Sequence, residues 1–158
     1  MLEYQYFFPA AWRLGVCYSI YLSTDSEADL SAENSELVSF LKEPVPEPYQ
    51  SLLKYPQNWY AGSMSGCSCT FRHLYSVELG FSELVDWYEE GEDEIVATLL
   101  FVKVIRHLNT LGFQVDCVDT WYGAGREDIT EMNVILDHIA DEQFRFFENH
   151  HFVFGNGV

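Results

Sequence analysis

Two cysteines and a histidine lie close together in the segment SGCSCTFRHL, residues 65–74. Thiolate sulfur and imidazole nitrogen are ligands that zinc prefers in proteins. If this segment forms a strand, Cys67, Cys69 and His73 share one face, because side chains alternate between the two faces of a sheet. A four-ligand zinc site needs one more group, and Cys117 on a later predicted strand is the first candidate.

Other interpretations of this cysteine face stay open. Free cysteine packs as a small apolar side chain, so the face can equally be core beneath a helix. A reactive thiol needs a cation on its own side, and strand alternation turns Arg72 to the opposite face. A Cys67–Cys69 disulfide is not expected, because same-face residues lie about 6.5–7 Å apart and bonded cysteines need Cβ atoms about 3.8 Å apart. His107 and His138 are alternative fourth ligands.

A second group of residues is acidic and aromatic. The segment ELVDWYEEGEDE, residues 83–94, is rich in carboxylates but lacks the ligand spacing of a calcium loop. Tryptophan and tyrosine are frequent anchors of protein interfaces, so the segment predicts a surface that a basic partner contacts. The alternative is a solvated loop that leads into a helix. The residues of the predicted surface are Asp86, Trp87, Tyr88, Glu89, Glu90, Glu92 and Asp93.

The charge of the chain limits the partners that it can have. The 158 residues include 25 acidic and 8 basic side chains, which gives a formal net charge of −17. Nucleic-acid backbones and anionic membranes both require positive charge, so neither is expected to bind. A basic protein partner is favoured instead, because long-range attraction speeds its association.

Familiar catalytic and targeting motifs are absent from the sequence. It has no G-x-S-x-G, no H-E-x-x-H and no phosphate-binding glycine loop. Asp116 and Asp119 are three residues apart, so on a strand they point to opposite faces. No apolar run is long enough to cross a bilayer, and the first residues lack the basic start of a signal peptide. We therefore expect a cytoplasmic protein whose four cysteines are reduced.

Hydrophobic periodicity predicts a single α+β domain over residues 1–158. The order β-α-β-β-α-β up to residue 121 is that of ferredoxin-like folds, an antiparallel sheet with helices packed on one face, here with a C-terminal extension. Residues 131–139 fit a helix or a strand, and the β-branched pair there favours a strand. The predicted strands are 13–22, 58–61, 67–75, 114–121 and 151–155, and the predicted helices are 34–41, 92–111 and 140–150.

Together these observations predict a non-catalytic interaction protein, similar in role to an inhibitor or immunity protein. It would engage a basic partner through its acidic and aromatic surface. The alternative is a small metal-binding or thiol-dependent enzyme that uses the strand face of Cys67, Cys69 and His73.

Overall fold

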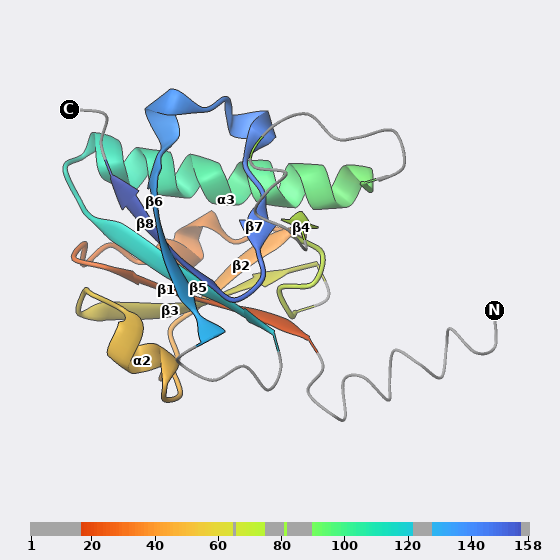
Figure 1. Ribbon diagram of the computed structural model, residues 1–158. Helices are drawn as coiled ribbons and strands as arrows, with labels where there is room; N and C mark the ends of the chain where they lie inside the picture. Colours follow the sequence, from red (N-terminus) through yellow and green to blue (C-terminus); the bar gives the residue numbers. More distant parts are fainter. Residues whose placement is uncertain (1–16, 65, 75–80, 82–89, 122–127, 156–158) are drawn as a thin grey trace.

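A six-stranded, mostly antiparallel sheet forms the centre of the protein (Figure 1). The computed structural model describes residues 17–64, 66–74, 81, 90–121 and 128–155. The strand order is β2-β3-β1-β5-β8-β6, and only the β6–β8 pair is parallel. The strands are β1 (Tyr18–Thr24), β2 (Val38–Leu41), β3 (Gln57–Ser63), β5 (Val115–Trp121), β6 (Thr130–Ile135) and β8 (His150–Gly155).

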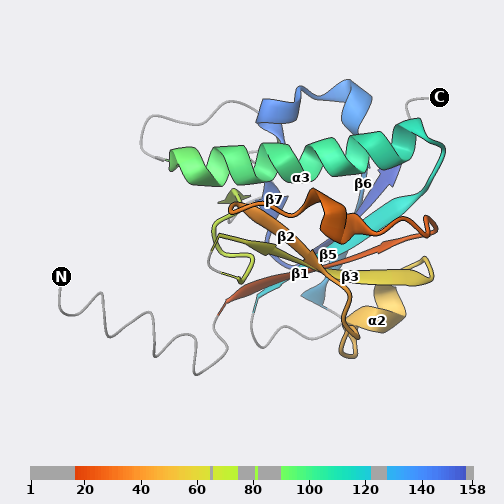
Figure 2. The ribbon, with the colours of Figure 1, turned by 180° about the vertical axis from the view of Figure 1, so that it is seen from behind.

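One long helix covers one face of this sheet, and a short helix lies on the other side (Figures 1 and 2). The long helix is α3 (Glu92–Thr110) and the short one is α2 (Tyr49–Leu52). A small parallel sheet of β4 (His73–Leu74) and β7 (Phe146–Phe147) lies near α3. Three 3₁₀ turns complete the described elements: η1 (Leu30–Glu33), η4 (Leu136–His138) and η5 (Asp141–Gln143).

The helix α3 forms as its sequence predicts. Acidic residues occupy its first turn, where they favour the positive end of the helix dipole. Gly112 follows the last turn with φ of +89°, a conformation that glycine adopts without steric cost. The inner face of α3 buries Phe101, Val102 and Ile105, and Phe101 packs edge-on against Phe146 of β7. This packing is the main apolar core.

The α+β class is confirmed, but the ferredoxin-like order βαββαβ is wrong. The predicted helix over 34–41 is instead the edge strand β2, which pairs antiparallel with β3. Val38 and Phe40 are buried on its inner side, so the buried positions alternate as in a strand. Leu37 and Leu41, which are four residues apart, hid this alternation because their spacing fits a helix. The Asn34 side chain holds the strand by accepting a hydrogen bond from the Phe40 amide, with a nitrogen–oxygen distance of 2.6 Å.

The predicted strand over 67–75 is also wrong in most of its length. Residues 67–71 form turns and bends, and among the described residues of this range only His73 and Leu74 belong to a strand, β4. The strand alternation predicted for Cys67 and Cys69 therefore does not apply. The predictions for β3, β5, β6 and β8 are confirmed, with shifts of a few residues at the ends.

No helix within the described ranges has both the length and the apolar character that a membrane span requires.

Candidate functional site

The residues predicted to form the acidic and aromatic surface have different environments. Residues 86–89 lie outside the described residues. Glu90 is turned inward, with a side chain only 1% exposed, whereas Glu92 and Asp93 are exposed in the first turn of α3. Glu90 is therefore used inside the protein and cannot meet a partner in this conformation.

Glu90 holds a buried ion pair. Its carboxylate accepts two hydrogen bonds from Arg72, from Nε and Nη2, both with nitrogen–oxygen distances of 2.6 Å. Nη2 of Arg145 lies 3.6 Å from the same carboxylate, and the Arg145 side chain is 3% exposed. This two-point contact between guanidinium and carboxylate ties β4 to the start of α3, and its role is structural.

An exposed acidic segment follows β1, and we call it the acidic lip. Its turn η1 is capped by Asp29, whose carboxylate accepts hydrogen bonds from the amide and hydroxyl of Ser31. These bonds lower the pKa of Asp29, so the group is charged at neutral pH. Leu30 anchors the turn in the core. The acidic lip comprises the exposed side chains of Asp25, Glu27, Asp29, Glu33 and Glu36.

A groove of about 530 Å³ separates the acidic lip from the C-terminal half of α3. Asp29 and Glu33 lie on its lip side, and Lys103 and His107 lie on its α3 side. Leu111 lines the end of the groove and is 59% exposed. The floor consists of the buried apolar side chains Leu30, Val38, Val104 and Leu108. This arrangement suits an occupant that has apolar side chains on one side and positive charge concentrated along one edge.

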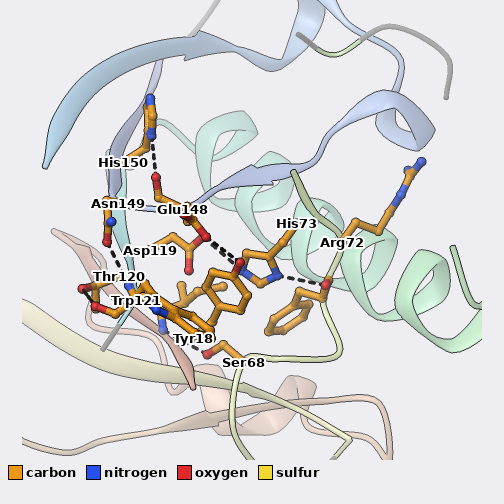
Figure 3. A network of polar contacts seen from close by, with 12 residues as sticks. Tyr18, Ser68, Arg72, His73, Asp119, Thr120, Trp121, Glu148, Asn149 and His150 are labelled. Atoms are coloured by element: carbon orange, nitrogen blue, oxygen red, sulfur yellow. Dashed lines mark hydrogen bonds and ion pairs between the residues drawn. The ribbon is translucent and has the colours of Figure 1, made fainter. Parts of the chain in front are cut away.

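A buried imidazole–carboxylate pair lies on the α3 side of the sheet (Figure 3). Nε2 of His73 is 3.0 Å from Oδ2 of Asp119, and Nδ1 is 3.0 Å from the carbonyl oxygen of Phe71. Because a carbonyl only accepts, Nδ1 carries a proton. Tyr18 stacks on the imidazole with ring centres 3.8 Å apart. Burial raises the pKa of Asp119, and the nearby His73 opposes that rise. Both ring nitrogens of His73 therefore face oxygen atoms rather than the sulfur atoms of Cys67 and Cys69.

A second histidine–aspartate pair involves Asp116. The Asp116 carboxylate accepts hydrogen bonds from the Ser23 hydroxyl and the Lys54 amide, and lies 2.7 Å from Nε2 of His151. The carboxylate stands between the serine and the histidine, so His151 cannot take a proton from Ser23. The group therefore lacks the order of a catalytic triad, in which histidine occupies the middle.

The structure brings Cys67 and Cys69 together, but their neighbour is Cys17 at the start of β1. His73 is paired with Asp119 instead, and Cys117 is fully buried in the core, where burial raises its pKa. Nothing in the local pattern around Cys67 and Cys69 indicates this partner, because Cys17 falls in a different predicted strand. None of the four cysteines forms a disulfide.

Alkaline pH should destabilise the protein. Burial raises the pKa of Tyr60 from 10.0 to about 12, and the pKa values of Cys17 and Cys69 are raised from 9.0. The native state keeps these protons after the unfolded chain loses them, so their stabilising contribution is intact below about pH 9 and is lost as pH rises further. Urea unfolding of reduced protein at about pH 8 and about pH 10 should show the loss.

The variant Tyr60→Phe provides the matched comparison, since it removes one of the titrating groups. Its unfolding free energy should fall less steeply with pH than that of the unchanged protein. Equal slopes for the two proteins would contradict the assignment of Tyr60 to this effect.

Comparison of the chain with protein-family models, curated proteins and solved structures finds no match.

Proposed function

We propose that the protein is a non-catalytic interaction protein that binds a basic segment of a partner protein, in the manner of an inhibitor or immunity protein. The observation that carries the proposal is the acidic lip beside an apolar groove. The occupant would be an amphipathic segment whose apolar side chains cover the groove floor. Its lysine or arginine side chains would face the carboxylates of the lip.

The two sides of the groove would also fix the orientation of the partner. Lys103 repels cations on the α3 side, whereas Asp29 and Glu33 attract them on the lip side. The net charge of −17 adds a long-range attraction for any basic partner. Four cysteines without a disulfide are compatible with the cytoplasm, the compartment that we propose for this interaction.

Neutralising the lip should weaken binding of a basic amphipathic probe. The probe is a fluorescent synthetic helix of leucine and lysine, and its affinity is measured by anisotropy at about 50 and 300 mM salt. The variant carries Glu27→Gln, Glu33→Gln and Glu36→Gln. Three exposed charge pairs at about 0.5 kcal/mol each predict roughly tenfold weaker binding. The affinity of unchanged protein should fall with salt.

The matched control removes the same charge elsewhere on the surface, so it separates the groove from net charge. It carries Glu92→Gln, Asp93→Asn and Glu142→Gln. We expect this control to bind the probe within about twofold of the unchanged protein at the higher salt. If it weakens binding as much as the lip variant, the acidic lip is not the contact surface. A greater loss in the control would favour the segment before α3 instead.

Reversing the charge of Lys103 should act in the opposite direction. Lys103→Glu removes a repulsive charge from the groove and adds an attractive one, so the lysine-rich probe should bind about threefold to tenfold more tightly. Lys54→Glu makes the same change of net charge at an exposed side chain that does not line this groove. Equal gains from the two variants would show that the probe responds only to total charge.

A further inference from the structure

We propose that Cys17, Cys67 and Cys69 form a zinc site, independently of the proposed partner groove. Their three sulfur atoms all lie within 4.8 Å of one another. Tetrahedral zinc with zinc–sulfur bonds of about 2.3 Å places its sulfur ligands about 3.8 Å apart. A small contraction of the cluster therefore produces the bound geometry. The three side chains are half-buried, so a water molecule can reach the fourth position.

The loop that carries two of these cysteines is fixed to the sheet by Ser68, which stands between them (Figure 3). The Ser68 hydroxyl donates to the Ala61 carbonyl and accepts from the Ile20 amide, at 2.6 and 2.9 Å. Its own amide donates to the Tyr18 carbonyl. The side chain thus bridges β1 and β3 at the start of β1, beside Cys17. Thiols held in place before metal arrives need little ordering when it binds.

Two glycines allow the loop to fold back this closely. A Cβ atom on Gly62 would lie 2.8 Å from the carbonyl oxygen of Gly66, and Gly66 itself has φ of +84°. The amide of Ser63 donates to the Cys67 carbonyl at 2.7 Å, which closes the turn. Backbone contacts therefore set the position of Cys67, so its thiol does not depend on a flexible loop.

The surroundings of the sulfur atoms suit a bound cation. The Tyr18 amide donates to the sulfur of Cys69, a bond that stabilises thiolate charge. Zinc binds the thiolate form of cysteine, so zinc uptake must release thiol protons and must tighten as pH rises. The excess of acidic side chains raises the local concentration of cations.

Zinc titration of the full, reduced chain tests the site directly. Protein freed of metal with a chelator is titrated with Zn²⁺ against a chromophoric competitor, and with Co²⁺ as a spectroscopic probe. We expect about one equivalent of either metal, a sulfur-to-cobalt charge-transfer band, and release of up to about three protons per metal in weak buffer. Uptake below about a tenth of an equivalent would overturn the proposal.

Single substitutions identify the ligands. Cys17→Ser should weaken zinc binding by about 100-fold or more and reduce the charge-transfer band by about one third, since one of three thiolates is lost. Cys117→Ala is the matched control, because its sulfur is outside the cluster, and it should keep full stoichiometry. Unchanged affinity in Cys17→Ser would overturn the three-thiolate assignment.

Thiol protection in the unchanged protein gives a readout that needs no variant to fold. Bound Zn²⁺ should slow alkylation of Cys17, Cys67 and Cys69 together by about tenfold or more, as mapped by peptide mass. The buried Cys117 should react slowly with or without zinc. Protection of Cys67 and Cys69 without Cys17 would contradict the site.

Discussion

The free energy of unfolding should fall by about 3–5 kcal/mol when Glu90 is replaced by alanine. The change removes the carboxylate that pairs with Arg72 and also faces Arg145. Both guanidinium groups are nearly inaccessible to water, so water cannot replace the lost charge. The Arg72 side chain keeps its bond to the Glu142 carbonyl, which compensates only in part.

Urea unfolding of Glu90→Ala at neutral pH measures this loss. Glu92→Ala, two residues away and exposed, is the control and should change stability by less than about 0.5 kcal/mol. The double variant Glu90→Leu with Arg72→Met should recover part of the loss, because it removes the unpaired charge of Arg72 while the charge of Arg145 remains. A loss below about 1 kcal/mol in Glu90→Ala would show that the ion pair is solvated.

A loss of about 3 kcal/mol or more is expected for Asp116→Ala. This carboxylate accepts from Ser23 and the Lys54 amide and contacts His151, and each buried donor left without a partner costs about 1–3 kcal/mol. Because the donors come from three different segments, the effect should extend beyond the site. Amide hydrogen exchange should increase at Lys54 in particular.

The same measurement on two other variants tests the explanation. Asp116→Asn keeps one acceptor oxygen, so it should cost less than the alanine change. Asp137→Ala removes a carboxylate whose side chain is 66% exposed and should cost less than about 1 kcal/mol. Similar losses for Asp116→Ala and Asp137→Ala would show that burial of the Asp116 carboxylate and its hydrogen bonds has little effect on stability.

The parts of the fold that the sequence predicted well are those with long, unambiguous periodicity. The segment of α3 has helical spacing over many turns, with acids at its start and a glycine after its end. Strand β5 follows the turn at Gly112 and carries the β-branched and aromatic residues Val115, Val118, Thr120 and Trp121, which favour a strand. Strand β2 was missed because four residues are too few to separate the two periods, and its pairing with β3 decided the outcome.

The site was harder to predict because its partners are remote in sequence. An acidic run gives no sign of which carboxylate turns inward, and Glu90 does so because Arg72, far back in the chain, lies beside it. The local pattern S-G-C-S-C suggested a strand, since it could not show that Ser68 would bond to β1 and β3. The contact of Ser68 with β1 and β3, rather than the alternation of side chains along a strand, determines that Cys17 is the cysteine near Cys67 and Cys69.

The position of β8 has a consequence for synthesis on the ribosome. This strand is translated after the other five of the large sheet, yet it lies between β5 and β6. A nascent chain that has emerged only as far as β6 has an open hydrogen-bonding edge on β5, and β6 has no neighbour to pair with. The sheet can close only once residues 150–155 leave the exit tunnel, so completion of the large sheet is expected to wait for β8 rather than to proceed strand by strand during synthesis.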